Sequence, residues 1–359
     1  MKQCKFANIS PVTGITLLTD IRAQSTFDDF KLFFSGFDLY QHTGCPLITP
    51  YILPRLFYFS TKEQDLFNRT RYFADSKAYL FEWLTGDFVT DVSTAAATQC
   101  FNLHSYQWDG LLAAIGLSAD QFPAIQDGTT YLRPLKNTHR LAWGLKKEVK
   151  VLLGVYDGAA LAMGLSGLQP GCGIINLGTS AMLRVPGKYP VFDKNENKKI
   201  QPYALKRNCF LNNGALNNAA LSLNWLRTQL FDVDLRNLQL MGNSTNAPLF
   251  CLPYLTGERD SKTGPYASGV FFGLRQNHTK TDIARAVLEG VAYSMNYIFD
   301  ALKENGLQVN QLYMGGGGIQ IPLCPQIFSD IRPAHYPVNR AAGRINWQCY
   351  AGIFGSRDG

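Results

Sequence analysis

Charged residues are scarce in this 359-residue sequence, and several familiar sequence features are missing from it. Asp, Glu, Lys and Arg make up only 17% of the residues, whereas 46% are hydrophobic. This composition is typical of an ordinary globular protein and excludes a disordered tail, a collagen-like array and a charge-driven coiled coil. No segment approaches the roughly 18 consecutive apolar residues that a membrane span needs, so we expect no membrane partner.

The eight cysteines and five histidines lack the spacing of metal sites. No two cysteines are paired closely in the manner of a zinc site, and the histidines are scattered. The chain is also too long for a small disulfide scaffold. The start, Met1–Lys5, runs into a mixed stretch and not into an apolar signal core. We therefore predict reduced thiols, no metal-ligating residues and a cytoplasmic protein.

The positive charge is a weak indication of a partner. Lys and Arg number 34 against 27 Asp and Glu, so the formal net charge is 34 − 27 = +7. The densest basic cluster sits in a polar connection and comprises Lys194, Lys198, Lys199, Lys206 and Arg207. A solvated loop explains it better than a nucleic-acid patch, so no nucleic-acid partner is expected. An anionic small substrate would suit the same balance.

The length predicts two domains, and the order of elements predicts an α/β fold. Apolar spacing favours helices over 77–84, from near Ser93, over 159–168 and over 282–305, the last ending at Gly306. Short apolar runs favour strands over 149–155 (buried), 173–177, 181–185 and 309–314. The second and third of these strands form a hairpin. The domain boundary is expected near Leu165–Gly173.

Three segments could carry chemistry. Asp157 follows a predicted strand, where α/β folds place ligands, and could act as a general base, although a helix N-cap before Gly158 explains it at least as well. The turn Gly178-Thr179-Ser180 could hold phosphate or be an ordinary hairpin turn. The run Gly315–Gly318 would let a backbone approach a nucleotide closely.

Other patterns favour structural roles. Asp127-Gly128-Thr129-Thr130 does not follow a clean strand and is interpreted as a surface turn. The aromatic residues within 27–34 and 51–59 are expected in the core. Neither a Rossmann fingerprint in the right context nor a Walker lysine motif is present.

Taken in this order, the segments resemble the FGGY family of carbohydrate kinases, from about Asp20 to Ile331. Several segments carry the resemblance: 84–91 (Leu-Thr-Gly-Asp-Phe-Val-Thr-Asp), 154–158 (Gly-Val-Tyr-Asp-Gly), 177–180 (Leu-Gly-Thr-Ser), 253–259 (Pro-Tyr-Leu-Thr-Gly-Glu-Arg), 269–274 (Gly-Val-Phe-Phe-Gly-Leu) with 282–289 following, and 316–318 (Gly-Gly-Gly). The most specific of these is 269–274 with the residues 282–289 that follow it, and 253–259, just before it, matches too.

The resemblance implies a fold of two actin-like, ribonuclease-H-like domains with a cleft between them, divided here as 1–165 and 166–359. It implies ATP and Mg²⁺ as cofactors, a small sugar as substrate, and allows a homodimer. Asp157 would be the general base for attack on the γ-phosphate. The sugar would contact Asp20, Arg22, Asp157 and Asn213. The nucleotide would contact Gly178, Thr179, Ala220, Asn224, Gly316, Gly317 and Gly318.

Within the family, the segments 127–130, 177–181, 203–204 and 212–218 look most like gluconate kinases, because an Asn-rich wall suits a hydroxyl-rich chain. Ketopentose kinases are the next alternative, and analogy of fold alone does not decide between the two substrate classes. A non-catalytic sugar- or nucleotide-binding relative and a module that partners an intact kinase are further alternatives.

Several departures from the family pattern affect the expected activity. No Asp-x-Gly-Thr-Thr/Ser segment, the family's first phosphate and Mg²⁺ site, precedes Asp20. We therefore expect an N-terminally truncated chain with an incomplete first domain and weak or no turnover. Ala219-Ala220 replace a Gly-Gly pair. Pro322 and Pro325 lie where a helix should follow the glycine loop, which Pro tolerates only in the first turn. After Ile331 the similarity fades, and 332–359 lacks the family's terminal helix.

Overall fold

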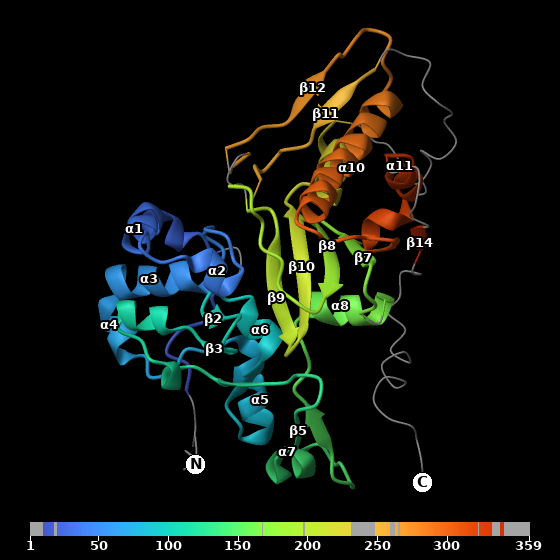
Figure 1. Ribbon diagram of the computed structural model, residues 1–359. Helices are drawn as coiled ribbons and strands as arrows, with labels where there is room; N and C mark the ends of the chain where they lie inside the picture. Colours follow the sequence, from blue (N-terminus) through green and yellow to red (C-terminus); the bar gives the residue numbers. More distant parts are fainter. Residues whose placement is uncertain are drawn as a thin grey trace. The chain divides into compact units, whose positions relative to one another are not determined.

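The computed structural model describes residues 10–17, 20–166, 168–196, 198–230, 248–258, 263–264, 266–321, 323–331 and 338–340. The chain forms two compact units, the first of residues 1–159 and 203–210, the second of residues 160–202 and 211–359 (Figure 1). A domain boundary between residues 165 and 166 remains a prediction. None of the helices in the described part combines the length and hydropathy that crossing a bilayer requires.

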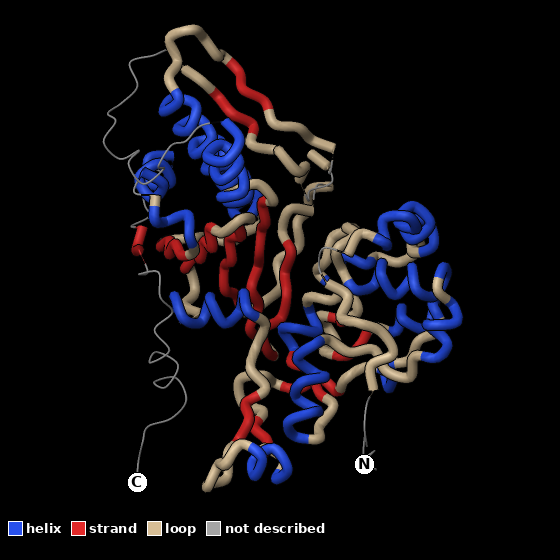
Figure 2. The backbone as a smooth tube through the Cα atoms, turned by 180° about the vertical axis from the view of Figure 1, so that it is seen from behind, coloured by secondary structure: helices blue, strands red, loops and turns tan. Residues whose placement is uncertain are grey.

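The first unit is mainly helical, and its strands are short (Figure 2). Its helices are η1 (Arg22–Thr26), α1 (Phe27–Phe33), α2 (Leu39–Thr43), α3 (Ile52–Lys62), α4 (Gln64–Arg69), α5 (Ser76–Thr85), α6 (Val92–Ala96), η2 (Gly110–Ile115), η3 (Ala119–Gln121) and α7 (Asn137–Ala142). Its strands pair as β1 (Val89–Asp91) with β4 (Ala124–Gln126) in parallel, and antiparallel as β2 (Phe101–Asn102) with β3 (Gln107–Trp108) and β5 (Leu132–Pro134) with β6 (Lys150–Leu152).

Aromatic packing builds the core of the first unit, but the prediction that all aromatic residues of 27–34 and 51–59 lie in the core is only partly right, because Phe33 is exposed. Phe30, Phe34 and Phe57 are buried. The ring centroid of Phe30 lies 5.0 Å from that of Phe34 and 5.7 Å from that of Phe57. The first pair is tilted and the second is edge-on, arrangements that aromatic pairs prefer. These contacts join α1 to α3 and fix the helical layer.

Local capping explains where α5 and α6 begin, close to the predicted positions. The carboxylate of Asp75 accepts the N–H groups of Lys77 and Ala78, and Asp91 likewise caps α6. Gly86, in the left-handed conformation with φ 91°, ends α5 at the predicted turn.

Two predictions for the first unit are wrong. The run 149–155 is not a buried strand: only Lys150–Leu152 pairs, and Lys150 and Leu152 are exposed. Asp127-Gly128-Thr129-Thr130 is not a surface turn, because Gly128 and Thr129 are buried and strand β4 does precede them. Both errors have one cause, since burial of such short segments depends on the neighbours that tertiary packing supplies.

The second unit is built on a mixed sheet with strand order β14-β13-β7-β8-β10-β9. The strands of this sheet are β7 (Cys172–Leu177), β8 (Ala181–Gly187), β9 (Gln201–Lys206), β10 (Cys209–Leu216), β13 (Gln311–Gly315) and β14 (Val338–Arg340). Residues 203–206 of β9 and 209–210 of β10 are those that group with the first unit. Strands β11 (Phe250–Leu252) and β12 (Val270–Phe272) form a separate antiparallel pair. The other elements are α8 (Asp157–Ser166), which starts in the first unit, α9 (Ala220–Trp225), the π-helical turn η4 (Leu226–Leu230), α10 (Lys280–Glu304), η6 (Gly317–Gln320) and α11 (Leu323–Ile331).

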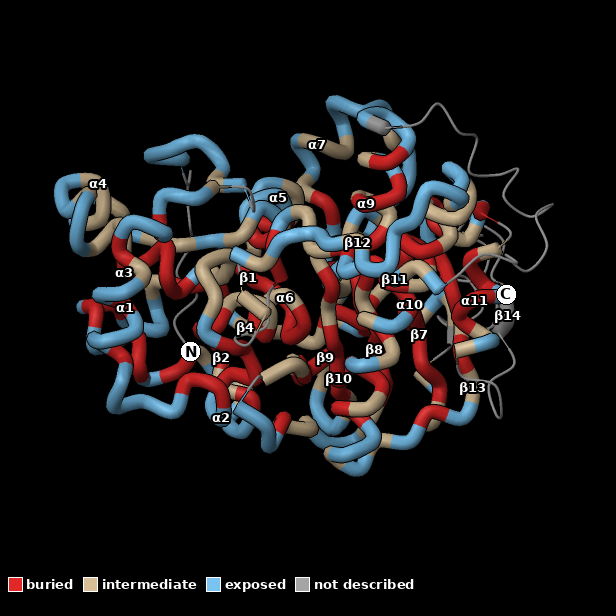
Figure 3. Tube along the Cα trace, turned by 90° about the horizontal axis from the view of Figure 1, so that it is seen from above, coloured by how far each residue is buried: buried red, intermediate tan, exposed pale blue. Residues whose placement is uncertain are grey.

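The predicted hairpin and long helix form the centre of this unit. Strands β7 and β8 pair antiparallel, and β13 adds to β7 in parallel. Helix α10 begins with a capping box between Thr279 and Asp282, and Gly306, with φ 86°, follows its end. Its apolar face packs on the sheet, and the buried segments of Figure 3 coincide with α10, β7, β8 and β10. A Cβ at Gly214 would lie 2.1 Å from Ile298 Cγ2, so glycine lets α10 approach β10.

The helix after the glycine run is confirmed. Helix α11 starts at Leu323, so the buried Pro325 falls in the first turn, where its missing N–H costs no helical hydrogen bond. Pro322 and the stretches 332–337 and 341–359 lie outside the described residues.

Candidate functional site

Two glycine-containing turns lie side by side in the second unit, at the ends of the parallel strands β7 and β13. Gly315 of β13 pairs with Asn176 of β7, so the turns that follow leave the same edge of the sheet. A Cβ at Gly316 would lie 2.7 Å from Leu177 O. The glycine run therefore contacts the residue just before the turn Gly178-Thr179-Ser180.

The start of α9 is attached to the same turn. The N–H groups of Ala219 and Leu221 donate to Thr179 O over 3.2 and 3.1 Å, and that of Ala220 donates to Gly178 O over 3.0 Å. Asn224 is exposed one turn further along α9, on the same face as Ala220. All the residues proposed for the nucleotide thus belong to one region.

This region has the chemistry of a phosphate site. Thr179, Gly316 and Gly317 are exposed at its surface. Successive backbone N–H groups in such turns bind anions, and glycine lets a ligand reach the backbone. A Cβ at Gly318 would lie 2.5 Å from Leu177 Cδ2, so the close approach of the two turns needs glycine there.

Asn213, proposed for the sugar, is 3% exposed on β10. Its Nδ2 donates to Gln201 O over 3.0 Å. Its Oδ1 finds no hydrogen-bond partner among the described residues. The oxygen is itself covered by protein, so a ligand hydroxyl could use it only if neighbouring groups move, and the role of Asn213 in sugar binding stays a prediction.

The rest of the Asn-rich segment serves the protein itself. Asn217 N–H donates to Glu258 Oε2 over 3.0 Å, and Asn218 Nδ2 donates to Glu258 Oε1 over 3.0 Å. Asn218 Oδ1 accepts from Thr256 N–H and Oγ1. Glu258 is 5% exposed, so this carboxylate ties the segment 253–258 to the end of β10.

Glu258→Ala should destabilise the second unit. It removes the carboxylate that accepts the N–H groups of Asn217 and Asn218, a loss worth about 1–3 kcal/mol of unfolding free energy. Urea unfolding followed by circular dichroism measures it. Glu258→Gln is the matched control, because its amide oxygen still accepts and should preserve more than half of the difference. Equal loss in both variants would contradict the hydrogen-bond explanation.

Asp157 is the first residue of α8 and is exposed. Its Oδ1 accepts the N–H of Gly158, the next residue, over 2.6 Å, whereas an N-cap side chain accepts from the second or third residue after it. The carboxylate has a second oxygen that this contact does not use. The observed contact is thus not that of an N-cap, and proton acceptance by Asp157 stays a prediction.

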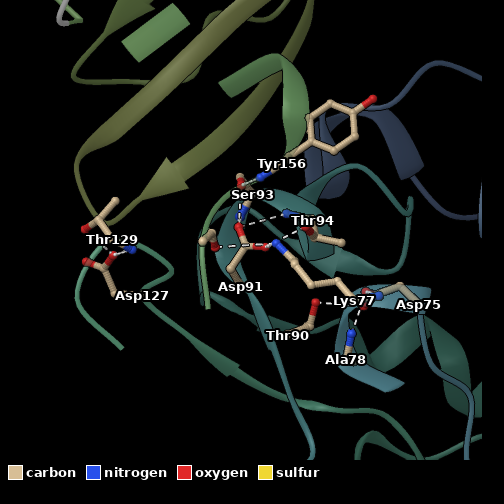
Figure 4. A network of polar contacts seen from close by, with 11 residues as sticks. Asp75, Lys77, Ala78, Thr90, Asp91, Ser93, Thr94, Asp127, Thr129 and Tyr156 are labelled. Carbon is tan, nitrogen blue, oxygen red and sulfur yellow. Dashed lines mark hydrogen bonds and ion pairs between the residues drawn. The ribbon is translucent and has the colours of Figure 1, made fainter. Parts of the chain in front are cut away.

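A dense polar network lies in the first unit next to the residues that precede Asp157 (Figure 4). The carboxylate of Asp91 is fully buried and pairs with Lys77. Ser93 and Thr94 both donate their hydroxyls to it. Ser93 Oγ also accepts the N–H of Tyr156 over 2.8 Å. Sequence reasoning missed this network, although the Asp-x-Ser-Thr spacing at the start of a helix was a signal for it.

Asp20 and Arg22 form an ion pair. Arg22 donates from Nη2 to Asp20 over 2.7 Å and from Nη1 to Glu63 over 3.1 Å. Hydrogen bonding from Arg22 lowers the pKa of Asp20 from 3.8 to about 2, so its carboxylate stays ionised at neutral pH. Each Asp20 oxygen accepts two hydrogen bonds from Arg22, so the pair is held together as a unit.

Burial suppresses the reactivity of several described cysteines. Burial raises the pKa of Cys45, Cys251 and Cys324 to about 12, so these thiols stay protonated. Across the described residues, no group of three or more His, Cys, Asp or Glu side chains could hold a metal ion.

Family models match nearly the whole chain. The model described as "FGGY family of carbohydrate kinases, N-terminal domain" matches residues 7–164, and the corresponding C-terminal domain model matches residues 173–343. Among curated proteins, the gluconokinase of Bacillus subtilis (strain 168) is 27% identical over 342 residues, which are 90% of this chain and 66% of that protein. The xylulose kinase of Escherichia coli (strain K12) is 31% identical over 80% of this chain and 60% of its own length.

Solved structures agree. The ligand-bound xylulose kinase of Lactobacillus acidophilus is 26% identical, with a TM-score of 0.86 over 96% of this chain and 70% of that one. The gluconate kinase of the same organism is 26% identical, with a TM-score of 0.85 over 95% and 71%. The chain spans less than two thirds of the length of the two curated relatives named above.

Proposed function

The chain belongs to the FGGY family of carbohydrate kinases, and we propose that it transfers the γ-phosphoryl group of ATP to a hydroxyl of a small sugar or sugar acid. Its fold is the two-domain, actin-like and ribonuclease-H-like α/β fold of that family. The observation that carries the proposal is the assembly of the turn 178–180, the start of α9 and the glycines 316–318 at one edge of the second unit's sheet.

This assembly fits the phosphates of ATP. Gly316 and Gly318 have no room for a Cβ beside Leu177, so the turns lie close together and present backbone instead of side chains. Thr179 would bind phosphate oxygens through its backbone N–H. Gly178, whose own N–H donates to Ser180 O over 3.0 Å, would let the nucleotide approach the turn, and Ala220 and Asn224 would lie beside it. Mg²⁺ takes much of its coordination from phosphates and water, so it would arrive with ATP.

Asp157 would act as the general base. One carboxylate oxygen is held by the N–H of Gly158, which leaves the other to accept the proton of the attacking hydroxyl. Since phosphoryl transfer needs little covalent assistance from a protein, positioning and electrostatics would supply most of the acceleration. Asp20, Arg22 and Asn213 would hold the hydroxyls of the acceptor through hydrogen bonds.

Gluconate is the favoured acceptor, and xylulose or another ketose or polyol is the alternative. Gluconokinase and gluconate kinase stand among the relatives, and so do xylulose kinases at equal or higher identity. The unused oxygen of Asn213 and the ionised Asp20 both suit hydroxyls, which every one of these sugars offers.

Sugar-dependent ADP formation with Mg-ATP tests the proposal. Gluconate, xylulose, ribulose and glycerol are compared, and gluconate is expected to give a kcat/KM at least about tenfold above the others, equivalent to about 1.4 kcal/mol. A higher value for xylulose would establish the ketose alternative. ATP binding by calorimetry without turnover on any of these sugars would support a non-catalytic binding protein instead and contradict the proposed reaction.

A further inference from the structure

Three segments of the first unit converge just before Asp157. They are the start of α6, the turn 127–129 and the connection 153–156 that links β6 to α8 (Figure 4). A Cβ at Gly128 would lie 2.0 Å from Gly154 O and 2.8 Å from Asp91 Cβ, so the segments are in direct contact. Gly154 N–H donates to Gly128 O over 3.0 Å, and Gly154 itself has φ 75°. The connection is therefore held in one shape that glycine permits.

Asp91 is at the centre of this contact, and it has more partners than helix capping requires. Its carboxylate accepts the N–H groups of Ser93 and Thr94 over 2.8 and 3.2 Å, the usual cap. It also accepts both hydroxyls and pairs with Lys77, whose side chain is 26% exposed. A fully buried charge is costly unless it is paired and hydrogen-bonded in this way, so the network holds together as a unit.

The hydrogen-bond direction at Ser93 follows from this charge. An ionised carboxylate only accepts, so the single hydroxyl proton of Ser93 goes to Asp91. The lone pairs of Ser93 Oγ then face the N–H of Tyr156, 2.8 Å away. Lys77 Nζ, on the other side of Asp91, lies 3.4 Å from Gly154 O. The network thus contacts the backbone at both Gly154 and Tyr156, the residue immediately before Asp157.

We propose that Asp91 and Ser93 are positioning residues that fix the backbone before Asp157 and so aim its carboxylate at the acceptor hydroxyl. The catalytic part of this inference rests on the proposed function. A shift of about 1 Å in a reacting group can cost up to about 100-fold in rate, so a single backbone hydrogen bond at this point has a measurable effect. A purely structural cap would stabilise α6 without affecting the rate.

Ser93→Ala and Thr94→Val separate the two roles. Both remove one hydroxyl that donates to Asp91, but only Ser93 also accepts from Tyr156. Ser93→Ala should lower kcat by about tenfold or more, with KM for ATP within about threefold, because the variant moves Asp157 and leaves the residues proposed for the nucleotide in place. Thr94→Val should leave kcat within about twofold. Ser93→Cys, which keeps the shape and replaces the hydroxyl with a poor hydrogen-bonding thiol, provides a second variant if Ser93→Ala does not fold.

Hydrogen–deuterium exchange tests the contact without reference to turnover. The Tyr156 amide should exchange at least about tenfold faster in Ser93→Ala than in the wild type. In Thr94→Val its exchange rate should equal that of the wild type. Equal kcat losses in the two variants, or wild-type kcat in Ser93→Ala, would overturn the positioning role. If the wild type turns over no sugar, the proposed function fails, and unchanged exchange at Tyr156 would then overturn this inference separately.

Discussion

Asp157→Asn should lower kcat for sugar-dependent ADP formation by about 10²- to 10⁴-fold, the range that a general base contributes. Asn keeps an oxygen that can accept the N–H of Gly158, so the start of α8 should be preserved. The substitution removes the group that takes the proton and little else. ATP affinity, measured by calorimetry, should therefore change by no more than about threefold.

Asp38→Asn is the matched control for Asp157→Asn. Asp38 is also an exposed aspartate at a helix start in the first unit, where it caps α2 by accepting the N–H of Gln41 over 3.1 Å. Asn caps nearly as well as Asp, so this variant should keep kcat within about twofold. Robust sugar-dependent turnover in Asp157→Asn would show that Asp157 is not the general base. Its role would then be limited to the start of α8, the structural alternative that the sequence leaves open.

Local sequence signals predict the elements of the second unit well. The hairpin 173–185 and the helix 282–305 lie within one or two residues of β7, β8 and α10. The reason is physical: an apolar run ended by a glycine turn, and an apolar stripe at helical spacing ended by Gly306, specify structure without distant partners. Both domain models confirm the family resemblance. The motifs that carry this resemblance are likewise short, local segments of sequence.

Convergence of distant segments could not be predicted in this way. Nothing in the sequence shows that Gly128 lies against Asp91 and Gly154. The absence of a clean strand before it predicts a surface turn, whereas Gly128 and Thr129 are buried. Likewise the contact of Ser93 with Tyr156 joins residues 63 positions apart. The roles proposed for Asp157, Asn213 and the glycines remain predictions, since local structure alone does not determine which exposed groups a ligand meets.

Gly316→Ala should lower kcat/KM for ATP by about 100-fold, equivalent to about 2.7 kcal/mol. Gly316 has φ 95°, a conformation that costs a side-chain-bearing residue about 1–3 kcal/mol. Its Cβ would also lie 2.7 Å from Leu177 O and 2.8 Å from Asn176 Oδ1, so the glycine turn has to move away from β7. The two turns proposed to hold the phosphates would then separate. Steady-state kinetics with ATP as the varied substrate measures the effect, with calorimetry for nucleotide affinity.

Gly317→Ala is the control that the next residue offers. Gly317 is exposed, and a Cβ there would meet nothing within 4 Å. Alanine at 317 should therefore keep the turn in place, so that its effect on kcat/KM for ATP reports only contact between the nucleotide and the added methyl group. The loss should be at least about tenfold smaller than that of Gly316→Ala, about 1.4 kcal/mol. If both variants lose ATP affinity equally, the loss reflects crowding of the nucleotide by any methyl group and not separation of the turns. If neither variant loses ATP affinity, the nucleotide does not bind at this edge of the sheet. Displacing the glycine turn from Leu177 would change any phosphate site beside it.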